Sequence, residues 1–509
     1  MKSNTASNRD QNIMGTPDRV NAAWGLTLVV YSLAKLWLVA DVELGKDEAV
    51  YWYWSQHLDA SYALLPFSLM ASAHALAPYS EWVLRFPSVL LGALSTYLLF
   101  ALCTGAGLSA NRARWAAAAF ASSHWIWHTS SYLHPDVFLV TCWLLALIAA
   151  QRACGRDKTL DYVYMGIACG LAVLCKYSGA FLTAGLGLWL LTTRPPQRRW
   201  LALAAFIIPA LVVAIPLIHV QLNTFFYLPQ TLSTLSKIEK TSEPFSRLFF
   251  FLTNPLLFVS PPLLYLLYRA GYHSLQQRRN EAHLLALLPA LCAIGAFMFF
   301  ALYRGQIKGN WILVGFLSLW PLAFALPVRR WLLCATVITG LAQALTIGFA
   351  LKYPATFSQY FSANDIDASY VGLVSKKDRS REPSYSWSER LCEYSGWQNF
   401  SHDLQKLLAQ KGIVQNLPLV SSQYSIPFTV AYYSSLPRSY YTVDDPRFRD
   451  LTDLYANAPD RIGPMLFITR KKTPLSQSLQ HFSMRPLGHL TRAVNGCLPI
   501  SYQVYIFSP

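Results

Sequence analysis

Long apolar segments alternate with short polar connections through the first two thirds of the chain. A helix that crosses a bilayer needs about 20 mostly apolar residues, and this criterion predicts about eleven such helices. Their expected positions are residues 22–40, 84–105, 114–130, 136–152, 161–175, 178–193, 200–221, 248–268, 283–302, 312–327 and 331–351. The pattern therefore predicts a polytopic α-helical membrane protein.

The pattern changes near residue 352, beyond which the chain is visibly more polar. There the stretches LPLVSS, FTVAYYS and PMLFITR are typical of short strands, and SHDLQKLLAQ is typical of a helix. We therefore expect a small α/β domain after the membrane part. The predicted organisation is a cytoplasmic tail at 1–21, a transmembrane domain at 22–351 with its first external loop at 41–83, and a soluble external domain at 352–509.

Composition and charge support this organisation. Hydrophobic residues make up 54% of the 509 residues and charged residues only 13%, which disfavours a soluble globular protein. The net charge of +16 comes from basic residues between the apolar segments and not from a basic stripe with stacking aromatics, so we predict no nucleic-acid partner. The polar first 20 residues and the absence of a small-residue cleavage site indicate that the first apolar segment is a retained helix.

The basic residues also predict the topology, because cytoplasmic loops collect Lys and Arg. With the N-terminus inside, every predicted cytoplasmic loop is basic: Arg112 and Arg114; Arg152, Arg156 and Lys158; Arg194, Arg198 and Arg199; Arg278 and Arg279; Arg329 and Arg330. An odd number of spans then leaves the last domain outside. We expect a multi-pass protein of a bacterial inner membrane with a periplasmic C-terminal domain, in contact with membrane lipids.

Seven of the nine cysteines fall within or at the ends of the predicted spans, where Cys usually serves as a small apolar residue. The other two, Cys392 and Cys497, lie in the external domain, and the sequence leaves open whether they form a disulfide. The chain has no Walker loop or dinucleotide fingerprint, so neither nucleotide hydrolysis nor a redox cofactor is expected.

Four charged residues stand out because the topology places them all at the external ends of predicted helices. Asp47 and Glu48 follow the first span in GKDEAVYWYWSQHL, Asp136 follows the third, and Lys176 follows the fifth. Each could simply cap a helix end, but charges beside the apolar slab are costly and tend to be functional. A carboxylate can accept the proton of an attacking hydroxyl or amine, and a cation can stabilise charge on a departing phosphate.

Several motifs resemble the bacterial branch of the dolichyl-phosphate-mannose protein mannosyltransferase family, glycosyltransferase family 39. They are DEAVYWYWSQHLDASY, EWVLRFPSVLLGAL, HPDVFLV, CGLAVLCKYSGAFL, GNWILVGF, SGWQNFSHDLQKLL and SSQYSIPFTVAYY, between about residues 40 and 440. That family includes the aminoarabinose transferases that modify lipid A. The resemblance implies a GT-C-type bundle of about 11 transmembrane helices with a C-terminal external α/β domain.

The resemblance also assigns roles to the external charges. It implies that Asp47 is the catalytic base with Glu48 beside it, that Asp136 is a second catalytic acidic residue, and that Lys176 binds the donor phosphate. Arg85 is a further phosphate candidate, although pairing with Glu81 or snorkelling to the interface would also explain it. Arg304 and Lys308 would add positive potential for the phosphate.

Contacts to the acceptor or the sugar are expected from His57, Tyr51, Tyr62 and Asn310, the last in a GNW stretch similar to a family motif. The aromatic run that begins at Tyr51 has an alternative explanation as part of an interfacial aromatic belt. One departure affects these contacts: bacterial relatives commonly carry Asp-His-Pro-Pro where this chain has SYALLPFS, so only Pro66 remains. This difference indicates altered specificity or impaired catalysis.

A metal site is a further hypothesis. His124 and His128 are four residues apart on a predicted helix and therefore share a face, and His134 follows shortly after. Such a set suits zinc, whereas histidines at aromatic-rich helix ends also serve as interfacial hydrogen-bonding groups. The implied chemistry requires no cofactor, and a divalent metal is left open.

The sequence thus predicts an inverting glycosyltransferase that uses a polyprenyl-phosphate-linked sugar donor. The acceptor is a glycolipid such as lipid A, a polysaccharide or a protein, and neither it nor the sugar is fixed by the sequence. Two alternatives are a transporter or flippase for a lipid-linked sugar and a noncatalytic scaffold. Transporters usually place their charges near the bilayer midplane in paired repeats, a pattern that this chain does not show.

Overall fold

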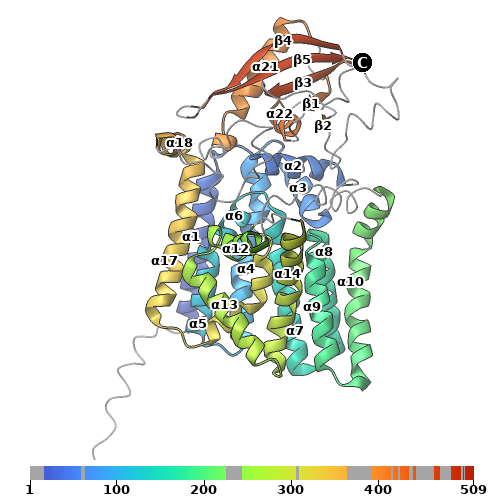
Figure 1. The fold of residues 1–509 in the computed structure, drawn as a ribbon, viewed down its shortest axis with the longest axis vertical. Helices are drawn as coiled ribbons and strands as arrows, with labels where there is room; N and C mark the ends of the chain where they lie inside the picture. The colour runs from blue at the N-terminus through green and yellow to red at the C-terminus, as the bar shows by residue number, and fades with distance from the viewer. Residues whose placement is uncertain are drawn as a thin grey trace, which may run out of the picture.

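Figure 1 shows the computed structural model of the chain, a helical bundle that carries a small sheet domain at one end. It describes residues 17–58, 63–224, 244–304, 309–363, 392–413, 417–421, 423, 425–434, 440–442, 463–470, 483–494, 497 and 499–508. Within these ranges, five helices are long and apolar enough to cross a membrane: α4 (Glu81–Gly105), α7 (Pro135–Arg156), α10 (Pro196–Thr224), α14 (Glu281–Arg304) and α17 (Arg330–Lys352). The prediction of a polytopic membrane protein is confirmed.

Three more predicted spans are occupied by single helices whose apolar part is shorter than that of the five. α1 (Pro17–Val39), α8 (Thr159–Cys175) and α9 (Gly179–Thr193) lie along the same axis as the long helices (Figure 1). The total of about eleven spans stays a prediction, because length and composition identify only the five long helices among the described residues. Basic connections, such as those from α9 to α10 and from α13 (Pro261–Gln276) to α14, lie at the end of the bundle away from the sheet domain (Figure 1).

Three predicted spans are interrupted. Residues 114–130 form α5 (Ala110–Ser122) and α6 (His124–Ser131), and Ser123 between them accepts a hydrogen bond from the backbone N–H of Ile126. Residues 312–327 form α15 (Leu313–Phe316), the 3-10 turn η3 (Leu317–Leu319) and α16 (Trp320–Ala325). Apolar runs predict burial in these segments, but hydropathy does not register a change of helix direction or pitch.

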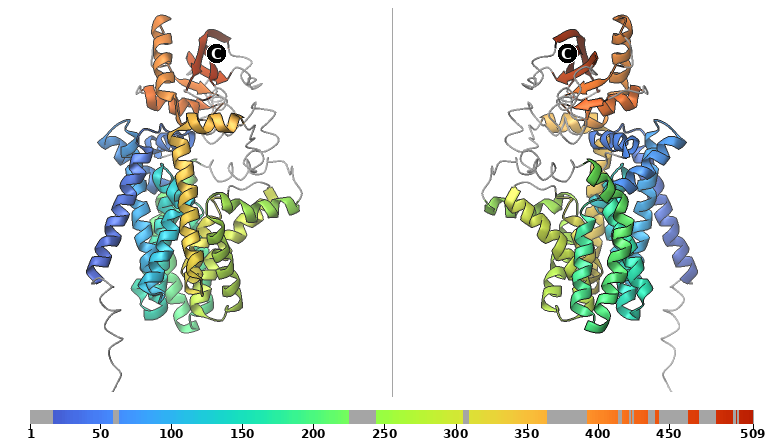
Figure 2. Two further views of the ribbon diagram at one scale, coloured as in Figure 1. Left: turned by 90° about the vertical axis from the view of Figure 1, so that its left-hand side faces the viewer. Right: turned by 90° about the vertical axis from the view of Figure 1, so that its right-hand side faces the viewer.

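The predicted single helix at 248–268 is wrong. The chain instead forms α12 (Pro244–Thr253), the 3-10 turn η2 (Asn254–Leu257) and α13. Proline has no N–H to donate, so Pro255 and Pro261 favour new starts over continuation of a helix. The views in Figure 2 show α12 projecting sideways from the bundle.

The sheet domain, called the cap below, contains five strands in the order β2-β1-β3-β5-β4. β1 (Leu419–Ser421) pairs in parallel with β2 (Tyr440–Thr442) and β3 (Met465–Arg470), whereas β5 (Ile500–Ser508) is antiparallel to β3 and to β4 (Ser483–Arg492). The predicted strands in LPLVSS and PMLFITR and the helix in SHDLQKLLAQ, which is part of α21 (Trp397–Gln410), are confirmed. The predicted boundary near residue 352 coincides with the end of α17, and the assignment of domains stays a prediction.

The predicted strand in FTVAYYS is wrong, because this stretch belongs to α22 (Ile426–Ser434). Its β-branched and aromatic residues favour a strand by propensity. In the structure the helix follows β1 and precedes the parallel strand β2, a connection that requires a crossover. Tertiary topology therefore overrides local preference here.

Two short helices lie across the end of the bundle beneath the cap, α2 (Lys46–Gln56) and α3 (Leu64–Leu76) (Figure 1). α2 packs against α22 of the cap, with the Tyr53 and Phe428 rings stacked at 4.3 Å and Trp52 edge-on to Tyr432 at 5.4 Å. Trp52, Tyr53 and Trp54 are buried. Trp52 and Tyr53 therefore form part of the contact between cap and bundle, whereas Trp54 stacks on Phe67 of α3, so the aromatic-belt interpretation does not hold for these three rings.

Candidate active site

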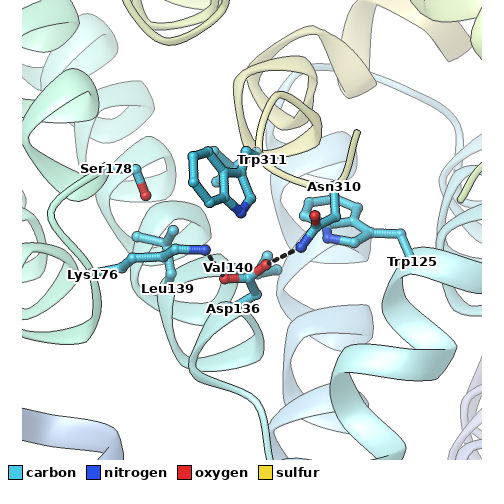
Figure 3. A pocket seen from close by; sticks show the side chains of 9 residues that line it. Trp125, Asp136, Leu139, Val140, Lys176, Ser178, Asn310 and Trp311 are labelled. Carbon is cyan, nitrogen blue, oxygen red and sulfur yellow. Dashed lines mark hydrogen bonds and ion pairs between the residues drawn. The ribbon is translucent and has the colours of Figure 1, made fainter. Parts of the chain in front are cut away.

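A buried carboxylate with two polar partners lies at the cap end of the bundle (Figure 3). Asp136 is only 4% exposed. Its Oδ1 lies 2.6 Å from the Nζ of Lys176, and its Oδ2 accepts a hydrogen bond of 3.2 Å from the Nδ2 of Asn310. The predicted proximity of Asp136 and Lys176 is thus seen directly, and Asn310 joins them from a segment 174 residues away.

Local structure holds each member in place. Pro135 begins α7, and His134 caps that helix by accepting a 3.1 Å hydrogen bond from the backbone N–H of Asp136. Lys176 is the C-cap residue of α8, so the end of that helix directs its side chain toward the start of α7. The Lys176 ammonium also lies 5.8 Å from the centre of the Trp311 ring, a distance compatible with a cation–π contact.

The three polar side chains line a cavity of about 10 Å³, room for roughly one water molecule. Its other walls are mostly apolar: Trp125, Leu139, Val140, Ser178, Trp311 and Val314. Lys176 retains 20% exposure of its side chain and is the most accessible charged group of the pair. The Lys176 ammonium carries three N–H donors, and the contact with Asp136 accounts for one of them.

Asp47 lies near this site on α2. Asp47 and Tyr51 are one helical turn apart and therefore share a face of α2, and the Tyr51 ring meets the His134 ring edge-on at 5.8 Å. The charges of Asp47, Glu48 and Asp136 all act on the His128 ring, so the three carboxylates lie within electrostatic range of one side chain. The predicted convergence of Asp47 and Asp136 near one end of the bundle agrees with this arrangement.

Glu48 and Arg85 are paired with each other. Arg85 is fully buried, and Glu48 is 3% exposed. All five N–H donors of the guanidinium are used: Nε and Nη2 to the Glu48 carboxylate at 2.9 and 2.7 Å, Nη1 to the carbonyls of Val39 and Val42, and Nη2 to the carbonyl of Glu43. Arg85 therefore has no donor left for a phosphate, and its partner is Glu48 in place of the expected Glu81 or the interface.

The Glu48 carboxylate is equally occupied. Besides Arg85 it accepts hydrogen bonds from the backbone N–H groups of Leu133 at 2.8 Å and Gly45 at 3.1 Å. These contacts tie the start of α2 to the ends of α1, α4 and α6. These contacts favour a positioning role for Glu48 and Arg85, and the catalytic and phosphate-binding roles implied by the resemblance stay predictions.

The remaining predicted residues have varied outcomes. His57 ends α2, where its Nδ1 lies 3.0 Å from the carbonyl of Tyr53 and its ring stacks on Tyr53, so its observed contacts are local. Asn310 contacts Asp136, while its predicted sugar contact stays a prediction. Tyr62, Lys308 and the side chain of Arg304 lie outside the described residues.

The histidines proposed for a metal are neighbours without forming a metal cage. The rings of His124 and His128 are 5.5 Å apart, and those of His128 and His134 are 6.4 Å apart. Across the described part of the chain, no group of three or more His, Cys, Asp or Glu side chains is arranged to hold a metal ion. Among the described residues, His124, His128 and His134 therefore form no preformed metal site, and a divalent metal stays a prediction.

Sequence reasoning missed two residues near the site. Lys35 is buried on α1, where it donates to the hydroxyl of Ser130 and lies over the Tyr31 ring; a lone lysine within the first apolar run was the available signal. Glu43 contacts the cap through its carboxylate, which accepts from the backbone of Trp397. Nothing local in the sequence indicates that partner, because it lies 354 residues later.

A bundle of long helices, a cap and charged residues at their junction define a polytopic membrane protein with a candidate reaction site beneath the cap. Residues 62–222 match the family model described as dolichyl-phosphate-mannose-protein mannosyltransferase, so the predicted resemblance to that family is confirmed over this part of the chain. Over 153 residues the chain is 28% identical to the lipid A galacturonosyltransferase RgtD of Rhizobium johnstonii. That alignment covers 27% of this chain and 30% of the relative, so it spans less than a third of the relative's length.

Two solved structures resemble the chain over almost its whole length. The apo structure of ArnT from Cupriavidus metallidurans gives a TM-score of 0.57 at 17% identity, covering 95% of this chain and 98% of that one. The structure of the same protein bound to undecaprenyl phosphate gives 0.59 at 17% identity, covering 94% and 98%. The predicted GT-C fold with its C-terminal sheet domain is confirmed.

Proposed function

We propose that this protein is a membrane glycosyltransferase that moves a sugar from a polyprenyl-phosphate carrier to an acceptor at the external face of a bacterial inner membrane. The observation that carries the proposal is the buried Asp136–Lys176 pair, with Asn310, at the cap end of the bundle. The similar fold of a protein solved with undecaprenyl phosphate supports a lipid-phosphate donor. The proposed cap location is the periplasm.

Lys176 is the proposed phosphate ligand. Its cation lies at the end of α8, where exchange of the Asp136 carboxylate for a phosphate would preserve a charge-assisted hydrogen bond. An apolar groove of about 700 Å³ runs along α8, α9 and α10 and includes Val173 and Ala180, which flank Lys176 in the sequence. A carrier whose phosphate met Lys176 could therefore lay its isoprenoid chain in this groove.

Asp47 is the proposed base. It would accept the proton of an acceptor hydroxyl or amine as that atom attacks the anomeric carbon of the donor sugar. The new bond forms on the face opposite the phosphate, and the bond from the anomeric carbon to the phosphate oxygen breaks. The polyprenyl phosphate leaves with the electron pair, its charge stabilised by Lys176, and the anomeric configuration inverts.

The proposed acceptor is a glycolipid, with lipid A as the first choice. The partial similarity to a lipid A galacturonosyltransferase favours it over a polysaccharide or a protein. A lipid acceptor could also approach laterally through the outer leaflet at the level of α2 and α3, which lie across the end of the bundle. The sugar is left open.

The test uses the purified full chain in liposomes with lipid A and a panel of undecaprenyl-phosphate sugars, each labelled in the sugar. We expect label to enter lipid A and free undecaprenyl phosphate to appear in equal amounts for one member of the panel. Label that crosses the bilayer while still attached to its carrier would instead identify a flippase. If no member of the panel gives transfer to lipid A or release of undecaprenyl phosphate, the proposed activity is contradicted.

A further inference from the structure

The cap contacts each of the four consecutive residues that precede Asp47. The Glu43 carboxylate accepts hydrogen bonds from the backbone N–H groups of Trp397 at 2.6 Å and Gln398 at 3.2 Å. The backbone N–H of Leu44 donates to the Tyr433 hydroxyl at 2.6 Å. This short segment, residues 43–46, is called the approach strand below; the name describes its course toward Asp47, and Lys46 already begins α2.

The next two contacts continue the pattern. A Cβ on Gly45 would lie 2.2 Å from the Tyr394 ring, so the backbone of the approach strand rests directly against that ring. The backbone N–H of Lys46 donates to the Glu393 carboxylate at 3.3 Å, and its ammonium pairs with the same group at 3.4 Å. Asp47 follows immediately.

On the cap side, these contacts come mainly from one braced segment, residues 392–398. It begins at Cys392, which forms a disulfide with Cys497 across 105 residues. Arg492 donates to the carbonyls of Cys392, Glu393 and Ser395, and its guanidinium lies 4.5 Å from the centre of the Trp397 ring. The segment is therefore a stiff part of the cap.

The Glu43 carboxylate is held at the N-terminus of α21. Trp397 and Gln398 begin α21 after Gly396, whose φ of +85° favours glycine, so their free N–H groups point out of the helix start toward the carboxylate. Burial raises the pKa of the Glu43 carboxyl, while the two backbone hydrogen bonds and Arg492 act in the opposite direction. At this half-buried place the carboxylate depends on its partners in the cap to offset the loss of water.

From below, the same stretch is held by the bundle through Arg85, which binds the carbonyls of Val42 and Glu43 and the Glu48 carboxylate. Asp47 thus lies in the first turn of α2, next to a stretch that the cap and the bundle hold from both sides. We infer that the cap is a clamp that positions Asp47 for proton transfer, with Glu43 as its positioning residue and the Cys392–Cys497 disulfide as its brace. This inference rests on the proposed function.

The first measurement follows the clamp itself. Hydrogen exchange of the amides of Leu44, Lys46 and Glu48 is compared in wild type, Glu43→Gln, Cys392→Ser/Cys497→Ser and the matched control Lys406→Gln. Lys406 lies on the exposed side of α21, away from the approach strand. We expect faster exchange at these amides in the first two variants and wild-type exchange in the control.

The second measurement follows turnover per folded protein. In Glu43→Gln we expect kcat to fall about tenfold or more, as for loss of a charge-assisted hydrogen bond, with unchanged binding of undecaprenyl phosphate. Because the effect acts through Asp47, it should disappear when Glu43→Gln is added to Asp47→Asn. A merely structural residue would lower kcat by the same factor in both backgrounds.

Unchanged exchange in both Glu43→Gln and the double cysteine variant would overturn the clamp. Faster exchange with wild-type kcat in a transfer-active protein would overturn the positioning role. If wild type shows no transfer at all, the proposed function fails, and the exchange comparison still decides whether the cap fixes the approach strand.

Discussion

At the scale of single residues, the site contains charged groups proposed to take part in the reaction and charged groups that hold neighbouring segments together. Asp47, Asp136 and Lys176 keep at least part of the arrangement expected of a reaction centre, whereas Glu48 and Arg85 satisfy each other and the surrounding backbone. Adjacent carboxylates in the sequence therefore have opposite roles. Successive helical residues point about 100° apart, so one can face the site while the next faces the core.

Asp47→Asn tests the reacting half of this division. We expect kcat to fall by about 10²- to 10⁴-fold, the usual loss when a well-placed base is removed. Binding of undecaprenyl phosphate, measured by titration calorimetry in detergent, should not change, because the proposed phosphate ligand is Lys176. Wild-type kcat in this variant would show that another group takes the proton.

The Glu48–Arg85 pair tests the holding half. Arg85→Met leaves a buried carboxylate without its main partner, and we expect a loss of about 3–5 kcal/mol in unfolding free energy. Glu48→Gln should be similarly destabilising, and Glu48→Gln/Arg85→Met should cost less than the sum of the two. Denaturant unfolding followed by tryptophan fluorescence measures all three, and additive losses would argue against direct coupling.

At the scale of helices, close packing depends on small residues at contact points. A Cβ on Gly166 of α8 would lie 2.1 Å from the carbonyl oxygen of Phe206 on α10, and one on Gly170 would lie 2.7 Å from that of Ala210. Such spacing lets two membrane helices approach closely. Because α8 ends at Lys176, its packing also sets the position of the proposed phosphate ligand.

Gly166→Ala therefore should separate α8 from α10 and lower stability by about 1–3 kcal/mol, the typical cost of overpacking. Gly187→Ala is the matched control, since its Cβ would meet only the Phe206 ring at 3.8 Å. Thermal unfolding in detergent should show a lower midpoint for the first variant and an unchanged or slightly higher one for the second. An unfolding midpoint of Gly166→Ala equal to that of wild type would mean that α10 moves aside without loss of stability.

Apolar pattern predicted most helices, because a membrane helix reports its own burial along its length. It failed where neighbours decide: Pro255 and Pro261 break the expected span at 248–268, and α22 is a helix despite strand-favouring residues. The charged residues of the site could be predicted because charged side chains are unusual at the border of a membrane. The partner of Arg85 was not, because several carboxylates were equally available in the sequence.

At the scale of the whole molecule, the cap and bundle meet through the short segment before Asp47. Gly45 is the tightest point of that contact, and its φ of −69° is accessible to any residue. Gly45→Ala therefore introduces a steric conflict with Tyr394 and no backbone strain. We expect Gly45→Ala to lower kcat while the helical bundle stays folded.

Second-site rescue makes this prediction specific. In Gly45→Ala/Tyr394→Ala, removal of the ring leaves room for the new methyl group, so kcat should recover at least in part relative to Gly45→Ala alone. Turnover and cap docking, followed by hydrogen exchange in α22, are measured together. A double variant that is no better than the single one would place the conflict elsewhere.

The cavity beside Asp136 bears on how such a protein behaves between turnovers. A lipid-linked sugar is an activated compound, and water in an open reaction centre would hydrolyse it without transfer to an acceptor. The Asp136–Lys176 pair leaves room beside it for about one water molecule, so bulk water has little access to these two groups. We therefore expect slow hydrolysis of a bound donor when no acceptor is present.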